Sequence, residues 1–447
     1  MQISCEKCLT LHLVMNQKDK DILAIAVPSI VSNITVPLLG LVDVSIVGHM
    51  GNAAYIAAIA VGSMTFNVIY WIFAFLRMGT SGMTSQAYGR RRIDEAVDLL
   101  TRALAVGVGV GMAFVVGQSL VKWAAMEVMQ PTSDIAPFTS TYFDICIWGA
   151  PAVLGLYSLT GWYIGMQNTR TPMMVSIFQN VVNIVASLVL VYLFDMKVEG
   201  VAYGTLTAQY AGFLAALLFL RSRFRNELVH FSLRALRDAA AMMSFFTVNR
   251  DIFLRTLFLV AVNLFFTAAG AKQGSVILSV NTLLFQLFTL YSFVMDGFAY
   301  AGEAIGGKYF GARDRAAFDD TVSRLFRWGL ALTALYTLLY LFVGEPFLRV
   351  LTDEPEVVEC SKNYILWAVA IPLAGMGAFY WDGLYIGMTA TRGMLTSTFV
   401  GAAVFFAIYL TLSPLLGNHA LWLALILYLV SRGIVQTFLF RKYRLRS

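Results

Sequence analysis

Four carboxyl side chains lie inside long apolar runs of the sequence, where ionisable groups are rare. Asp43 lies in the first run, Asp296 and Glu303 share a later run, and Asp382 lies in a third. An ionisable residue in the middle of a membrane span costs about 2.5–3.5 kcal/mol on insertion scales, so it needs a partner or a hydrated cavity. These four acids are therefore the candidates for carrying a proton or binding a cation.

Asp43 has the most suggestive surroundings, in the run PLLGLVDVSIVGHMG. No basic residue lies within a helical turn or two. Pro28 and Pro37 interrupt the same predicted helix, and proline removes a backbone hydrogen bond and permits a bend. An acid beyond a bendable helix can change its charge and the helix shape together. The alternative is an interfacial capping residue near the outer headgroups.

Amides and hydroxyls occur in two later runs and could surround such an acid. Asn180 and Asn183 are three residues apart on one predicted helix face, and Ser187 follows one turn later. Thr205 lies near the start of the next run. These groups could line a hydrated pocket. Alternatively they are interhelical hydrogen-bonding groups, which are common in membrane bundles.

The acids of the second half could form a second pocket or a structural network. Asp296 and Glu303 are seven residues apart and near one helix face. No basic residue lies close to any of the three acids in its own run, so we expect a hydrogen-bonded cluster that shares protons. Arg77, near the end of the second run, is expected to extend to the cytoplasmic interface.

The elements that position these residues are membrane-spanning helices. Hydrophobic residues make up 59% of the chain and charged residues 13%, against roughly 25% charged in soluble domains. Lipid must therefore be the solvent, and we predict an all-α membrane protein of twelve transmembrane helices. The predicted spans are 22–47, 54–80, 96–122, 138–163, 172–195, 200–220, 252–271, 276–305, 320–346, 362–387, 394–415 and 420–440.

The chain contains an internal repeat. GWYIGMQNTR starts at Gly161 and GLYIGMTATR at Gly383, with seven of ten positions identical at an offset of 222 residues. Six helices per half is an even number, so the repeat is parallel, as in transporters with a substrate path between two halves. We predict an N-lobe at 1–220, a cytoplasmic linker at 221–250 that could form a short amphipathic helix, and a C-lobe at 251–447.

The two halves differ where the acids lie. Phe266 stands at the repeat position of Asp43, and Thr160 stands where the second half has Asp382. The acids are therefore not part of the shared scaffold, and Thr160 joins Ser187, Asp296, Glu303 and Asp382 as a candidate for lining the substrate path.

Basic residues mark one set of loops and predict the orientation. Clusters such as 90–92, 221–225 and 441–446 follow the even-numbered spans, whereas the opposite loops hold few. The positive-inside rule then places both termini in the cytoplasm. Because the basic residues lie in these loops, the net charge of +6 is explained by membrane topology, and we expect no nucleic acid partner.

Enzyme and metal motifs are missing from the sequence. It has no HExxH, GxSxG or Walker A motif, and its four histidines are dispersed. Cys5 and Cys8 form a CxxC without a second pair to complete a zinc site. We expect no catalysis, no cofactor and no bound metal.

Several motifs resemble the multidrug and toxic compound extrusion (MATE) transporters, and specifically their DinF-like branch. The runs PLLGLVDVSIVGHMGNAAYIAAIAV, RDIFLRTLFL, MDGFAYAGEAIGGKYFGARD and WDGLYIGMTATR are similar to the first, seventh, eighth and tenth helices of that branch. The resemblance covers nearly the whole chain from about residue 18. It implies a V-shaped bundle of two six-helix lobes that exports cationic or amphipathic compounds in exchange for protons or sodium.

The resemblance also implies which residues couple transport to an ion. In DinF-like members the coupling groups lie in the N-lobe and correspond to Asp43, Asn183 and Thr205. The fifth-helix pattern of the family often ends in an aspartate, where this chain has Ser187. The sodium-linked NorM-like branch uses acids in the seventh and tenth helices, and this chain has Asp382 but no acid in its predicted seventh span.

These observations predict a proton-coupled antiporter in the cell inner membrane that exports drugs or organic cations as a monomer. Asp43 would carry the proton, with Asn180, Asn183 and Thr205 around it. Sodium coupling is one alternative. Another is a flippase for lipid-linked oligosaccharides from the same superfamily, which would need a basic central cavity, whereas few basic residues are found inside the predicted spans. A channel or a non-transporting scaffold is a rival from a different class.

Overall fold

The computed structural model describes residues 16–48, 52–352 and 354–444, and almost all of this part is helical. Cys5 and Cys8 lie outside the described residues. The first half contains α2 (Gln17–Gly48), α3 (Ala53–Ile72), α4 (Phe75–Gly89), α5 (Ile93–Val116), α6 (Gln118–Met129), α7 (Ala136–Cys146), α8 (Ala150–Gly165), α9 (Arg170–Leu188) and α10 (Val198–Arg223). The second half contains α11 (Ala239–Ala271), α12 (Ser275–Ala301), α13 (Gly307–Gly311), α14 (Arg315–Leu351), α15 (Pro355–Ser361), α16 (Ile365–Gly387), α17 (Thr391–Leu416) and α18 (Asn418–Arg444).

The helices confirm the predicted all-α membrane fold. Among the described residues, eleven helical segments are long and apolar enough to cross a membrane. Four of them are composite: α3 continues into α4, α7 into α8, α9 into the π-helix η2 (Val189–Leu193), and α12 into α13 through the π-helix η5 (Gly302–Gly306). Helix α2 adds a continuous segment of 32 residues. Together they are consistent with twelve spans, six on each side of the central connector.

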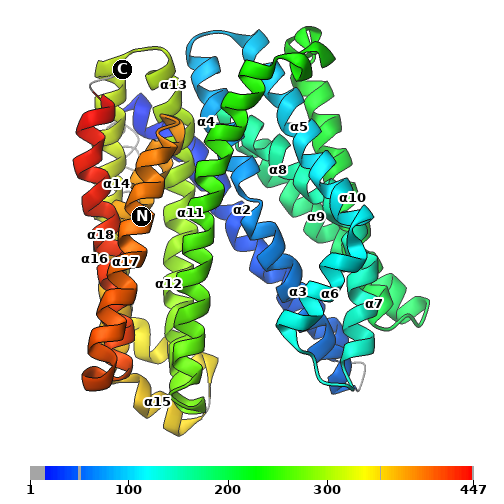
Figure 1. Cartoon of the computed structure of the whole chain (residues 1–447), viewed down its shortest axis with the longest axis vertical. Coiled ribbons are helices and arrows are strands. Elements are labelled where there is room, and N and C mark those ends of the chain that lie inside the picture. The colour runs from blue at the N-terminus through cyan, green and yellow to red at the C-terminus, as the bar shows by residue number, and fades with distance from the viewer. Residues whose placement is uncertain (1–15, 49–51, 353, 445–447) are drawn as a thin grey trace, which may run out of the picture.

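The spans form two lobes that meet at one end and separate toward the other (Figure 1). One lobe contains α3 to α10 and the other α11 to α18. At the end where they meet, Gln86 donates a side-chain hydrogen bond to the Gly387 carbonyl at 2.8 Å, and Gln167 donates one to the Ala304 carbonyl at 2.7 Å. The lobes are therefore joined beside the loops that follow α4 and α8, and the first of these loops contains the arginine cluster 90–92.

The connector between the halves differs from the predicted amphipathic α-helix. It contains two short 3-10 helices, η3 (Glu227–His230) and η4 (Leu233–Arg237). Asp238 then caps α11 by accepting a hydrogen bond from the Ala241 amide at 3.0 Å, a typical N-cap arrangement. As a result α11 starts well before residue 252, and it includes the polar residues that resemble a linker in the sequence.

Helix α2 contacts both lobes, although the predicted N-lobe boundary assigned it to one. Ile22 and Ile25 lie in the apolar core of the second lobe. Asn33 donates a hydrogen bond to the Phe293 carbonyl of α12 at 3.2 Å. Farther along, the Thr35 carbonyl accepts a hydrogen bond from Asn180 of α9 at 2.9 Å. A change in the shape of α2 can therefore alter how the two lobes are placed.

The repeat appears in the backbone as well as in the sequence. Of the six non-glycine residues with positive φ among the described residues, two pairs are separated by 222 positions: Arg91 and Arg313 at 60° and 57°, and Gln167 and Thr389 at 64° and 50°. A Cβ atom at Gly161 would lie 2.3 Å from the Arg77 carbonyl oxygen. A Cβ atom at Gly383 would lie 2.3 Å from the Ala299 carbonyl oxygen, 222 residues after Arg77. The repeated motif thus begins with a glycine because the backbone of a neighbouring helix passes there.

Candidate functional site

The N-lobe candidate site is built around a buried acid that has no counter-charge among the described residues. Asp43 on α2 is only 6% exposed. Its Oδ1 atom is buried and has no hydrogen-bond partner among the described residues. A carboxylate is costly in such surroundings unless it takes up a proton or receives a cation. This is the arrangement that a titrating transport residue needs.

The polar groups of α9 and α10 form a second part of the N-lobe site. The Asn183 side chain donates a hydrogen bond to the Thr205 hydroxyl at 3.0 Å, and both Asn183 and Ser187 are fully buried. Asn183 Oδ1 and Ser187 Oγ, one helical turn apart on α9, have no hydrogen-bond partner within the described part of the chain. Acceptor atoms thus remain available beside the Asn183–Thr205 pair.

Asn180 and Thr160 are placed differently. Asn180 donates a hydrogen bond to the Thr35 carbonyl and so joins α9 to the backbone of α2. The Ser176 hydroxyl supports the same junction, 3.1 Å from the Thr35 hydroxyl. Thr160 is half-buried on α8 and makes no side-chain hydrogen bond among the residues described. Their predicted roles in coupling and substrate contact stay predictions.

Proline in α2 creates a further polar junction that the sequence did not reveal. Pro28 has no amide hydrogen, so the Ala24 carbonyl lacks its usual intrahelical donor. The Thr169 hydroxyl, just before α9, donates a hydrogen bond to that carbonyl at 3.3 Å. The loop that follows α8 therefore holds α2 at a point where its own hydrogen bonding is interrupted.

In the second lobe, Asp382 is enclosed by donors from two other helices. Its Oδ2 atom accepts hydrogen bonds from Arg255 of α11 and from Arg432 of α18, the latter at 2.6 Å. Its Oδ1 atom accepts one from Gln436 at 2.6 Å. The two guanidinium groups and the carboxylate are each no more than 10% exposed. The predicted sharing of protons among acids is therefore wrong for Asp382, because arginines from other helices neutralise it.

Glu303 is paired across the lobe interface. The Arg77 guanidinium of α4 lies 3.2 Å from a Glu303 carboxylate oxygen, and both side chains are buried. The same guanidinium lies 4.1 Å from the ring centroid of Tyr300, a cation–π contact. The prediction that Arg77 extends to the cytoplasmic interface is therefore wrong, because the residue finds a buried carboxylate on the opposite lobe.

These charged groups line one cavity of about 210 Å³ between the lobes. Asp296 also lines it and makes no hydrogen bond or ion pair among the described residues. The lining contains Arg77, Arg255 and Arg432 with Asp296, Glu303 and Asp382, three positive and three negative formal charges. The cavity is therefore neutral overall, and its remaining walls are mainly aromatic and aliphatic.

The sequence-based expectation of few internal basic residues is thus wrong. Arg255 and Arg432 lie inside predicted spans, whereas the prediction considered mainly the basic residues of the loops. Their partner is far away in sequence, so no local pattern connects the three residues. The prediction that the seventh helix has no acid is also wrong, because α11 begins earlier than predicted and includes Asp251. The Asp251 carboxylate accepts a hydrogen bond from Thr391 at 3.1 Å. Asp251 does not line the cavity.

No group of three or more His, Cys, Asp or Glu residues that could hold a metal ion occurs within the residues described. Within the same part of the chain, Glu303 and Asp382 are paired with arginine, whereas Asp43 has no ion-pair partner.

Comparison with known proteins supports this architecture. The MatE family model matches the chain twice, at residues 28–189 and 252–412, once in each half. The chain is 33% identical over 443 residues to DNA damage-inducible protein F of Escherichia coli, covering 98% of this chain and 96% of that protein. It is 22% identical to the "Probable multidrug resistance protein NorM" of Photorhabdus laumondii, covering 96% of each.

Solved structures share the fold at low sequence identity. A Vibrio cholerae MATE transporter superposes with a TM-score of 0.86 at 15% identity, covering 96% of this chain and 97% of that chain. A multidrug resistance MATE family transporter in an outward-facing conformation gives a TM-score of 0.81 at 15% identity, covering 97% and 98%. The double match to one family model, the near-complete coverage of a relative and the shared two-lobed fold agree with the resemblance seen in the sequence motifs: the chain belongs to the MatE family of transporters.

Proposed function

We propose that this protein is a proton-coupled antiporter that exports cationic or amphipathic compounds, with Asp43 as the proton carrier. The observation that carries the proposal is the burial of Asp43 without a counter-charge or a partner for Oδ1 among the described residues. The names of relatives from Photorhabdus and Shewanella, both "Probable multidrug resistance protein NorM", support the class of substrate.

Exchange follows from mutual exclusion at one carboxyl group. A deprotonated Asp43 favours binding of a cationic compound in its lobe, whereas protonation removes that charge and favours release. A single site that cannot stabilise both ligands at once links the two equilibria, and the link is reciprocal. Proton entry from one side then drives export of the compound.

Helix α2 provides a physical connection between this exchange and the lobes. It carries Asp43 near its end, lacks a backbone amide donor at Pro28, and packs on α12 as well as α9. A change of charge at Asp43 would be accompanied by a change in the bend of α2. Because α2 contacts both lobes, the bend would favour one arrangement of the lobes over the other, consistent with rocking of one repeat against its partner.

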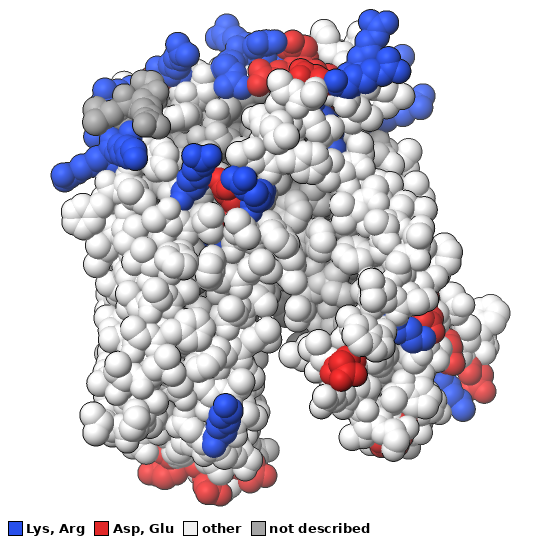
Figure 2. Space-filling view, in the orientation of Figure 1, with Lys and Arg blue, Asp and Glu red and all other residues white. Residues whose placement is uncertain are grey.

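The distribution of basic residues supports an orientation in the inner membrane with both termini cytoplasmic. Lysine and arginine side chains concentrate at the end where the lobes meet (Figure 2), which supports a cytoplasmic position for that end by the positive-inside rule. The space between the lobes opens toward the opposite end in the same view. The conformation described is then open to the outside, ready for proton uptake and substrate release.

Ser187 favours a proton over sodium as the coupling ion. Its hydroxyl has no hydrogen-bond partner within the described part of the chain, and it stands where an aspartate would supply a second charged ligand. A sodium site is normally built from several oxygen ligands with enough negative charge, whereas a proton needs one carboxylate. The cavity between the lobes does not favour the flippase alternative, because its three arginines are matched by three acids.

The test is substrate exchange in proteoliposomes that contain the purified protein as a monomer. We expect a pH gradient to drive accumulation of a fluorescent organic cation, and a sodium gradient at symmetric pH to have little effect. Asp43→Asn should abolish gradient-driven accumulation, whereas Asp144→Asn, the same change at an exposed residue of α7, should leave it intact. Full transport by a folded Asp43→Asn protein, or transport driven by sodium alone, would contradict the proposal.

A further inference from the structure

A large groove lies on the outer surface of the first lobe, away from the cavity between the lobes. It has a volume of about 860 Å³ and runs between α9 and α10. Residues Met174 and Phe178 of α9 face Ala215, Leu218 and Phe219 of α10. None of these residues belongs to the proposed coupling site, so the groove has no role in the mechanism above.

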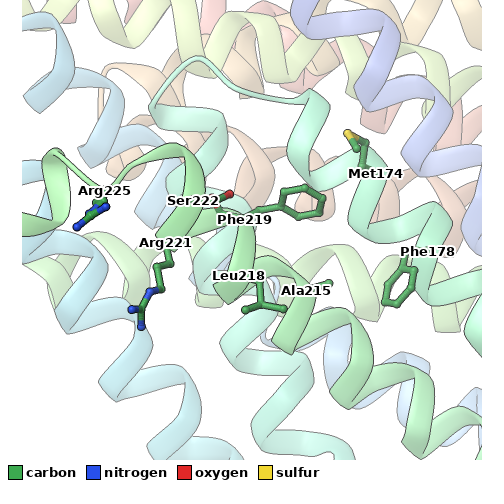
Figure 3. Close-up of a pocket in the computed structure, with 8 residues that line it drawn as sticks. All are labelled: Met174, Phe178, Ala215, Leu218, Phe219, Arg221, Ser222 and Arg225. Carbon is green, nitrogen blue, oxygen red and sulfur yellow. The ribbon is translucent and has the colours of Figure 1, made fainter.

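The groove is amphipathic along its length. Arg221, Ser222 and Arg225 lie toward one end, and the apolar side chains extend from there toward Phe178 (Figure 3). No ion pair or hydrogen bond is formed by the Arg221 or Arg225 side chain among the residues that the structure describes. Arg223, between them in sequence, is placed differently, with its guanidinium 5.6 Å from the Phe219 ring centroid. Two exposed positive charges are thus left at one end of an apolar channel.

The position of the groove relative to the membrane fits its polarity. Helices α9 and α10 are spans, and Arg221 lies in the last turn of α10. Leu218 is 68% exposed and Phe178 45% exposed, so both face outward from the lobe. The arginines then lie at the level of the lipid headgroups, and the apolar part of the groove lies within the hydrocarbon region. Basic pockets between spans on the cytoplasmic side are suited to anionic lipid headgroups.

We propose that this groove is a binding site for an anionic phospholipid. The lipid phosphate would accept hydrogen bonds from Arg221 and Arg225, and one acyl chain would lie along Phe178 and Leu218. A cationic transport substrate would be repelled by the two arginines. A phosphatidylcholine molecule carries a compensating positive charge on its headgroup, so it gains less from the same contacts.

The test is native mass spectrometry of the intact purified protein titrated with phosphatidylglycerol and with phosphatidylcholine of identical acyl chains. Each arginine near an anionic headgroup is worth about 1 kcal/mol, roughly fivefold in affinity. We therefore expect phosphatidylglycerol to bind about thirtyfold more tightly than phosphatidylcholine. Arg221→Ala/Arg225→Ala should remove this preference.

Two further variants separate a specific site from general attraction to charge. Arg223→Ala removes one charge, against two in the double variant, from the same part of the chain. The Arg223 guanidinium lies over the Phe219 ring but does not line the groove, so the preference should persist. Ala215→Trp fills the groove without changing charge, so phosphatidylglycerol binding should fall by at least tenfold. All four sites are on the surface, and unchanged melting temperatures without lipid would show that the variants fold. Equal binding of both lipids, or equal losses from Arg223→Ala and the double variant, would overturn the proposal.

Discussion

The two halves of this chain have a similar backbone fold but differ in whether a buried acid has a counter-charge. Within the part of the first half that the structure describes, one acid, Asp43, is buried without a counter-charge. In the second half, Phe266 occupies the repeat position of Asp43 and packs against Trp422, with ring centroids 5.1 Å apart. That half instead buries Asp382 between Arg255 and Arg432. The repeat therefore supplies the scaffold, and substitutions within it supply the chemistry.

The difference assigns distinct physical roles to the acids. Two guanidinium groups supply the counter-charge that a buried carboxylate needs, so Asp382 belongs to an ion cluster that joins α11, α16 and α18. An isolated buried carboxyl has no such stabilisation, so its charge can change with conformation. Removing each kind of acid should accordingly have opposite consequences for stability and for coupling.

The largest effect on stability is expected from Asp382→Ala. The change leaves two buried arginines facing each other without an anion, which costs about 3–5 kcal/mol when one member of a buried ion pair is removed. The melting temperature in detergent measures the loss. Asp144→Ala is the control, because its ion pair with Lys122 is on the surface and is worth about 0–1 kcal/mol. Similar melting temperatures for the two variants would contradict the buried ion cluster.

The ion pair between the lobes should be the next most sensitive. Glu303→Met leaves Arg77 buried without its partner and should lower stability by about 3 kcal/mol. Arg77→Met/Glu303→Met should recover most of that loss, because a well-packed apolar pair can replace a buried ion pair. A thermodynamic cycle of melting temperatures for both single variants and the double variant measures the coupling. Additive losses would show that the two side chains do not act as a pair.

A charge added at Ser187 should make the N-lobe site less selective. Ser187→Asp places a second carboxylate beside Asn183 and Thr205, and charge-assisted contacts to a cation are about twice as strong as neutral ones. We expect transport driven by a sodium gradient to rise about tenfold over the small wild-type signal. Ser187→Asn, which has similar size and no charge, is the control. A similar gain in both variants would point to altered packing instead of a new cation ligand.

The smallest effect is expected where the loop after α8 holds α2. Thr169→Val removes the hydroxyl that donates to the Ala24 carbonyl, at a cost of about 1 kcal/mol. Thr141→Val, on the exposed surface of α7, removes a hydroxyl bonded only to its own helix and should cost less. Hydrogen exchange of the α2 amides measures the local effect. Unchanged exchange near Pro28 in Thr169→Val would show that this hydrogen bond does not restrain the helix.

Periodic and local features of the fold could be predicted from the sequence. The length of each apolar run predicts a helix, and the short motif repeated at Gly161 and Gly383 predicts two halves. Each of these signals is contained in residues that are close together in the chain. The start of α11 was missed because Asp238 caps the helix before a polar stretch that resembles a linker. Local composition could not show that this stretch is helical.

The candidate site was only partly predictable for a related reason. Asp43 could be found because an acid inside an apolar run is unusual in itself. The ion pairs of Glu303 and Asp382 join residues on different helices, 226 and 127 positions apart for the contacts with Arg77 and Arg255. Such pairings depend on how the helices pack, and one sequence does not contain that information. The composition of each span alone therefore predicted that all three acids of the second half are unpaired. In the structure only Asp296 lacks an ion pair among the described residues.

The most direct measurement of the central claim is proton release on substrate binding to the purified protein. In weakly buffered detergent solution with a pH indicator, an organic cation should displace close to one proton per molecule bound to the wild-type protein. Asp43→Asn should still melt as a folded protein but release none, whereas Asp144→Asn, at an exposed residue of α7, should release as many protons as the wild type. Undiminished proton release from Asp43→Asn would contradict the account.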